Sequence, residues 1–101
     1  MQLNHLIVRL SEDLGIKIQK GTVLHYEKAG VFQPDEWKNG ARQYTEKEYV
    51  ELMKIVILSK LFNIPLDLIG LILSGNKEAA RAVKEGLSSR KKTIAYLLEV
   101  L

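Results

Sequence analysis

A chain of 101 residues is long enough for one compact domain and too short for two full-sized ones. Hydrophobic residues make up 47 % of it, which favours a packed core over global disorder. Its 15 basic and 12 acidic side chains leave a net charge of +3, which permits an anionic partner without requiring one. Because cysteine is absent, disulfides, thiol chemistry and thiolate metal sites are excluded.

The sequence contains no targeting or membrane-spanning signal. Residues 1–10 lack the basic start, apolar run and small-residue cleavage site of a signal peptide. The longest apolar stretch, residues 52–73, is interrupted by charged residues, Asn63 and Pro65, and so lacks the roughly 20 apolar residues that a membrane span needs. We therefore expect a cytoplasmic protein without membrane contact.

The first 30 residues predict two helices joined by a turn. Apolar residues recur at helical spacing over residues 3–14, and Gly15 follows, as is usual at a helix C-terminus. Thr22 is a good N-cap for a second helix over residues 23–29, which Gly30 closes. This order of elements is the outline of a helix-turn-helix.

Residues 31–44 predict a small β-hairpin, or wing. The segment opens on Val31 and Phe32, which are β-prone, and continues into turn residues. Asn39-Gly40 is the strongest hairpin signal in the chain, so we expect residues 41–45 to form the return strand.

The second half of the chain predicts further helices. Thr45 and Glu48 form a capping box at the start of a third helix, which ends near residues 62–63. Pro65 occupies the tolerated first turn of a fourth helix, which ends at residues 74–76.

Residues 77–101 predict one long helix with a heptad repeat. Its alternating a and d positions, which we call the seam, are apolar at every position except Arg90: Ala80, Val83, Leu87, Ile94, Leu97 and Leu101. Such a seam is typical of a two-stranded coiled coil. The alternative is that this helix folds back on its own domain.

Several motifs then follow one another in a recognisable order. They are Thr22-Val23-Leu24-His25-Tyr26-Glu27, Ala29-Gly30-Val31-Phe32, Asn39-Gly40-Ala41-Arg42-Gln43-Tyr44, the capping box, and Phe62-Asn63-Ile64-Pro65-Leu66-Asp67-Leu68-Ile69. Over residues 3–73 the chain resembles the winged helix-turn-helix domain of the MerR family of bacterial transcription regulators. The resemblance implies a mostly α fold with a small β-hairpin wing and a long C-terminal helix. We expect a DNA-binding domain over residues 1–75 and a dimerisation helix over residues 76–101.

The chain departs from the family pattern at positions that contact DNA. Leu24 stands where the family has arginine, His25 replaces the first of two tyrosines, and Ala41 replaces the aromatic residue of the wing. The expected set of phosphate contacts is therefore thinner than in the family.

A recognition helix needs polar or basic side chains at its N-terminal end, facing the major groove. Here the candidates are Lys17, Gln19, Lys20 and Thr22. Glutamine can pair with adenine and lysine with guanine. The alternative is that the two lysines only solvate a turn.

His25 and Tyr26 follow on the same helix, and by resemblance one or both contact phosphates. The alternative is that one of them is a packed core aromatic. By resemblance, Lys60 is a further phosphate candidate, and Lys38 lies at the wing tip beside Trp37.

Arg42 and Tyr44 are two residues apart on the return strand and so project from one face. The fork of Arg42 suits a phosphate. Alternatively, Arg42 pairs with Asp35 or Glu36, and Tyr44 packs on the third helix.

The resemblance implies a sequence-specific transcription regulator that binds an inverted-repeat operator as a homodimer. Its partners would be double-stranded DNA in the nucleoid and RNA polymerase at a promoter, and the dimer would form through Val83, Leu87, Ile94, Leu97 and Leu101. Since no residues follow the long helix, we expect no ligand-sensing domain.

Other functions remain open. The same domain could serve an architectural, excisionase-like or chromosome-segregation protein. Leu24 and Ala41 favour a helical interaction module that has lost DNA binding. We expect no enzyme, cofactor or metal, because the sequence has no Gly-rich phosphate loop, no carboxylate pair framed by histidine and no metal-spaced cluster.

Overall fold

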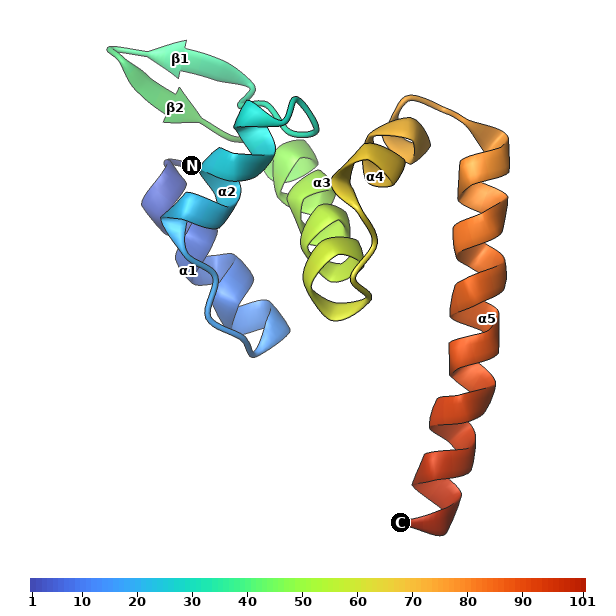
Figure 1. The fold of residues 1–101 in the computed structure, drawn as a ribbon. Helices are drawn as coiled ribbons and strands as arrows, with labels where there is room; N and C mark the ends of the chain where they lie inside the picture. Colours follow the sequence, from blue (N-terminus) through green and yellow to red (C-terminus); the bar gives the residue numbers. More distant parts are fainter. The chain divides into compact units, whose positions relative to one another are not determined.

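A computed structural model describes residues 1–101 and confirms the mostly helical fold with one small hairpin. The chain forms two compact units, an N-terminal unit (residues 1–70) and a C-terminal unit (residues 71–101), whereas the sequence predicted a boundary after residue 75. In chain order the elements (Figure 1) are α1 (Leu3–Leu14), α2 (Lys20–Lys28), β1 (Glu36–Lys38), β2 (Ala41–Gln43), α3 (Glu46–Val56), the π-helical turn η1 (Ile57–Leu61), α4 (Leu66–Leu73) and α5 (Lys77–Val100).

The helix-turn-helix pair has the predicted order but a different start for its second helix. Gly15 ends α1 in the left-handed conformation, with φ 67°. The N-cap of α2 is Gln19, and the Thr22 N–H donates to the Gln19 carbonyl at 3.1 Å. The prediction of Thr22 as N-cap was therefore wrong, because the helix begins at Lys20 without any side-chain cap and Thr22 lies inside its first turn.

The wing is a β-hairpin over residues 36–43 whose turn has two residues. β1 and β2 pair antiparallel, and Lys38 stands opposite Ala41 across the turn. Asn39 and Gly40 both have positive φ, 52° and 76°, which is the type I′ geometry that the dipeptide predicts. Val31 and Phe32 precede the wing and form no strand, and the return strand is shorter than predicted.

The capping box of α3 is formed mainly by Glu48. Its carboxylate accepts hydrogen bonds from both the backbone N–H and the hydroxyl of Thr45, each at 2.8 Å. After residue 56 the helix widens into η1, where the Phe62 N–H donates to the Ile57 carbonyl at 3.2 Å. The third helix thus ends where predicted, but through a π-helical turn that the sequence did not indicate.

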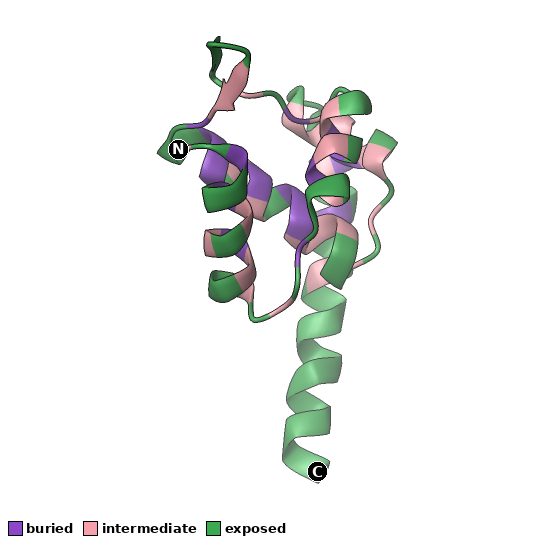
Figure 2. Ribbon diagram, turned by 90° about the vertical axis from the view of Figure 1, so that its left-hand side faces the viewer, coloured by how far each residue is buried: buried purple, intermediate pink, exposed green.

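The core of the N-terminal unit lies where its helices and the base of the wing meet (Figure 2). Its fully buried side chains are Leu6, Leu10, Val23, Tyr26, Tyr44, Leu52, Ile55, Val56 and Ile69. The ring of Tyr44 stacks on Phe32, with centroids 5.7 Å apart and an interplanar angle of 5°. The stacked pair anchors the end of the return strand in the core.

In the C-terminal unit, α5 begins at Asn76, whose side-chain oxygen accepts a hydrogen bond from the Ala79 N–H at 2.9 Å. The helix runs through Gly86 without interruption. Only Ala79 and Val83 of α5 are buried, and its second half is exposed throughout (Figure 2). No helix of the structure is long and apolar enough to span a membrane.

Candidate nucleic-acid interface

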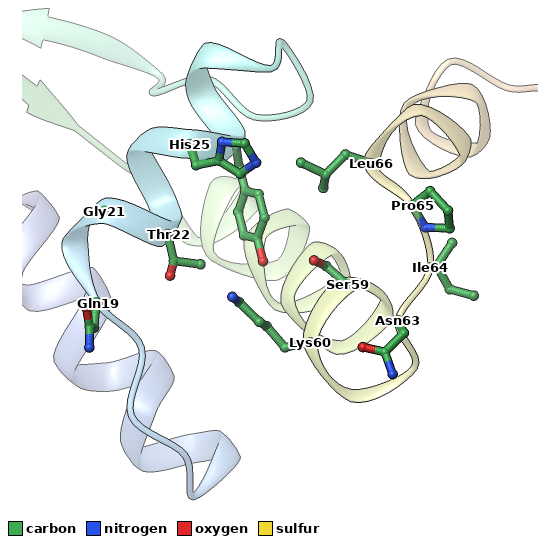
Figure 3. Close-up of a pocket in the computed structure, with 11 residues that line it drawn as sticks. Gln19, Gly21, Thr22, His25, Ser59, Lys60, Asn63, Ile64, Pro65 and Leu66 are labelled. Carbon is green, nitrogen blue, oxygen red and sulfur yellow. The ribbon is translucent and has the colours of Figure 1, made fainter.

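A groove of about 610 Å³ runs along α2, facing η1 and the segment that leads into α4. We call it the α2 groove. Polar side chains from both sides line it, and in Figure 3 Lys60 extends toward α2 and Thr22. The lining residues used below are Gln19, Thr22, His25, Tyr26, Ser59, Lys60 and Asn63.

The α2 side of the groove presents the residues predicted for a recognition helix. Gln19 and His25 are exposed, and Thr22 is half-buried. Because Gln19 is the N-cap, its side chain stands at the open N-terminal end of α2, where backbone N–H groups are free to bind an anion. Lys17 is exposed in the turn before α2 and does not line the groove.

The opposite side of the groove continues the face of α3 that makes the core. Leu52 and Val56 are fully buried, and the next positions on this side of the helix are Ser59 and Lys60, which are polar. Asn63, at the end of η1, has φ 55°, a left-handed conformation that asparagine tolerates better than most residues. Sequence analysis missed Ser59 and Asn63, although an apolar stripe that turns polar is a usable signal.

Tyr26 lines the groove from beneath, with only 1 % of its surface exposed. Burial raises the pKa of its phenol, and the neighbouring Ser59 hydroxyl partly opposes that rise. The contact with Ser59 does not meet hydrogen-bond geometry, so the Tyr26 hydroxyl is buried without a partner. Its burial favours the core-aromatic alternative, and its predicted phosphate contact stays a prediction.

Arg42 forms a two-pronged ion pair with Glu27 of α2. Its Nε and one terminal nitrogen donate to the two carboxylate oxygens at 2.8 and 3.0 Å. The hydrogen bonds from Arg42 to Glu27 raise the pKa of the guanidinium above its ordinary value. The guanidinium carbon also lies 4.4 Å from the centre of the Trp37 ring. The alternative partners predicted from the sequence, Asp35 and Glu36, were wrong: Arg42 stands opposite Trp37 in the hairpin and pairs with Glu27 of α2.

Lys20 and Arg42 line a second, smaller hollow of about 190 Å³, together with residues of the α1 start. The structure therefore brings the N-terminal end of α2 close to the return strand of the wing. Two positive side chains from different elements line this hollow, and one of them, Arg42, is paired with Glu27.

The other predicted wing residues differ in accessibility. Lys38 is exposed next to the hairpin turn, and Trp37 is 56 % exposed. Tyr44 is 1 % exposed, and burial raises its pKa to about 12. Its ring packs on Phe32, and its hydroxyl has no hydrogen-bond partner. The burial of Tyr44 favours a core role, and its DNA contact stays a prediction.

The residues predicted for dimerisation become more exposed toward the C-terminus. Val83 is buried and Leu87 is half-buried, whereas Ile94 is 50 %, Leu97 46 % and Leu101 98 % exposed. The apolar side chains of the second half of α5 are thus accessible to a partner.

Comparison with known proteins identifies the fold family. The model of the MerR HTH family regulatory protein matches residues 7–76, which is more than half of the chain and contains α2, the wing, α3 and α4. Among curated proteins and among solved structures, no match to the chain was found. The family match agrees with the helix-turn-helix and wing described above, and the chain therefore belongs to the MerR HTH family of regulatory proteins.

Proposed function

We propose that this protein recognises specific duplex DNA sequences with α2 and regulates transcription from inverted-repeat operators as a homodimer. The observation that supports this most is the α2 groove, whose polar edge carries Gln19, Thr22 and Lys60. These residues lie within the segment that matches the family of regulatory proteins. α2 is a short helix with an accessible N-terminal end, as insertion into the major groove requires.

Each predicted contact has a definite chemistry. Gln19 can form a pair of hydrogen bonds with adenine, and Lys20 can donate to the acceptor edge of guanine. Lys60 and His25 suit phosphates on either side of α2, and Lys38 suits one beyond the wing tip. Base contacts would determine the sequence preference, and phosphate contacts would fix the orientation of the protein on the duplex.

The twofold symmetry of a homodimer would match the symmetry of an inverted repeat. A dimer with twofold symmetry would place two α2 helices in major grooves about one helical turn apart. The seam of α5 is the proposed contact, through Val83, Leu87, Ile94, Leu97 and Leu101. The protein would contact RNA polymerase only at a promoter that carries such an inverted repeat.

Selection from a random duplex library with the purified protein, repeated at two salt concentrations, tests this function. We expect enrichment of an inverted repeat whose half-sites are spaced by one helical turn or a multiple of it. Binding without enrichment, lost steeply as salt rises, would replace the regulator with an architectural DNA-binding protein. No retained DNA even at low salt would reject DNA recognition and leave the interaction module.

A further inference from the structure

The net positive charge of the chain resides entirely in the C-terminal unit. Residues 1–70 contain nine basic and nine acidic side chains, whereas residues 71–101 contain six and three. Two of the N-terminal cations, Arg9 and Arg42, are also engaged by Glu46 and Glu27. All six C-terminal cations lie on α5. The unit that is proposed to recognise DNA therefore provides no excess charge to attract it.

Five of the six cations of α5 lie on one side of the helix, and the sixth, Arg90, lies in the seam. Lys77, Lys84 and Lys91 recur every seven residues and so form a row, which Arg81 and Lys92 flank. All five are exposed, and none takes part in the ion pairs of the structure. We call these five residues the α5 basic face. At a rise of about 1.5 Å per residue the lysine row is about 21 Å long.

A second copy of the chain would not neutralise this face. In the heptad of α5, the lysine row occupies the e positions, which flank the seam. The g positions are Ala79, Gly86, Thr93 and Val100, so neither flank offers an acidic residue to a facing helix. The three glutamates of α5, Glu78, Glu85 and Glu99, lie at f positions, in the same row as Lys92 and next to the lysine row, so this side of the helix carries five cations, three carboxylates and a net charge of +2. Ion pairing between two α5 helices therefore does not explain the row.

We propose that the α5 basic face binds the phosphate backbone of duplex DNA without sequence preference. This inference rests on the DNA recognition proposed above and adds a second surface to it. Duplex DNA carries one negative charge per about 1.7 Å of axis, so a row of this length meets more phosphates than it has lysines. The N-terminal unit would then supply sequence recognition, and α5 would supply most of the electrostatic attraction.

The test compares the salt dependence of binding for three variants on two duplexes, the selected operator and a random-sequence duplex. The first variant carries Lys84→Gln, Lys91→Gln and Lys92→Gln, and the second changes the same residues to arginine. The third is a charge-matched control, Lys28→Gln, Lys47→Gln and Lys54→Gln, on exposed positions of the N-terminal unit. Gln and Arg are both good helix formers, so α5 should persist, and sedimentation checks that every variant keeps the parent's oligomeric state.

We expect the slope of log affinity against log salt to fall by about 0.9 for each lost contact, hence by about 2 to 3 per chain in the Gln variant. The fall should be the same on both duplexes. The arginine variant and the N-terminal control should keep the parent slope.

An unchanged slope in the Gln variant, with the parent still selecting its operator, would overturn this inference and leave the proposed function intact. If the Gln variant lost binding to anionic phospholipid vesicles while its binding to DNA stayed unchanged, the inference would be overturned, because the α5 basic face would then bind a membrane surface. A parent protein that binds neither duplex would overturn both proposals.

Discussion

The two units of this chain use their side chains in opposite ways. The N-terminal unit leaves few of its large apolar residues exposed and balances its charges internally, with Arg42 paired to Glu27 and Arg9 paired to Glu46 above the Tyr49 ring. The C-terminal unit exposes both its apolar and its basic residues along α5. A unit with its own buried core is therefore followed in the chain by a helix whose apolar and basic side chains are exposed.

This contrast indicates that the N-terminal unit fixes the geometry of the binding elements, whereas α5 carries the excess charge. The N-terminal unit holds α2 and the wing in fixed positions, because Tyr44 and Phe32 anchor the wing and Glu27 ties Arg42 to α2. The helix α5 offers an apolar seam on one side and the α5 basic face on another. Changes in the first unit should act on stability and sequence preference, and changes in the second on assembly and electrostatic affinity.

The largest expected effect is on assembly. Ile94→Asp with Leu97→Asp places two charges in the seam of each copy, where burial of each original side chain would contribute about 1.5–3 kcal/mol. We expect the dimer to be lost at concentrations where the parent is dimeric, while the N-terminal unit stays folded. Sedimentation velocity and circular dichroism measure the two properties separately.

The opposite change sharpens this prediction. Arg90 occupies the one polar position of the seam, so Arg90→Leu should strengthen the dimer. If the double aspartate variant remained dimeric, the dimer contact would lie elsewhere in the chain.

The next effect is on the stability of the N-terminal unit. Tyr44→Ala removes a fully buried ring that stacks on Phe32 and should cost about 3–5 kcal/mol in the free energy of unfolding. Tyr44→Phe removes only a hydroxyl that has no partner, so it should be neutral or stabilising. Urea denaturation compares the two variants.

A tyrosine of α5 serves as the control. Tyr96 is 62 % exposed and lies outside the seam, so Tyr96→Ala should change the free energy of unfolding by no more than about 0.5 kcal/mol. A large loss in Tyr44→Phe would mean that its hydroxyl makes an important contact.

A smaller effect separates base contact from phosphate contact. Gln19→Ala should cost about 1–3 kcal/mol on the selected operator and relax the preference at one base pair. Lys60→Gln should weaken binding evenly on all sequences and lower the salt slope by about 1. Fluorescence anisotropy on the operator and on single-base variants distinguishes these outcomes, and equal losses on every duplex for Gln19→Ala would remove it from base recognition.

The smallest effect appears only at high pH. Burial raises the pKa of both Tyr44 and Tyr49 from 10.0 to about 12. For Tyr49, the hydrogen bond to Asp13 adds to this rise. Because the folded state favours the neutral phenols, their contribution to stability is complete below pH 10 and is lost as the pH rises through about 12. Urea denaturation across this range should show the fall, and Tyr44→Phe should make it shallower.

Local signals predicted the element boundaries well. Gly15, Gly30, Asn39-Gly40 and the Thr45 capping box fix the backbone through neighbouring atoms, and these ends lie where the sequence indicated. Two boundaries differ: Thr22, a good capping residue, lies inside the first turn of α2, which begins without a side-chain cap, and the return strand is shorter than predicted.

The site was harder to predict because its contacts join distant residues. Arg42 and Glu27 are fifteen positions apart, and no short-range pattern connects them. The π-helical turn η1, which contains Lys60 and precedes Asn63, likewise has no glycine or proline that would indicate it in the sequence. The burial of Tyr26 and Tyr44 follows from packing of the whole N-terminal unit, which periodicity alone does not specify.

Hydroxyl-radical footprinting of the full chain on the selected duplex tests the central claim most directly. We predict two protected regions related by the dyad of the inverted repeat, each centred on the major groove of a half-site, with protection of the flanking backbone reduced in the Lys84, Lys91 and Lys92→Gln variant. Protection of a single region without dyad symmetry, unchanged in that variant, would contradict both the dimeric recognition of DNA and the role of the α5 basic face.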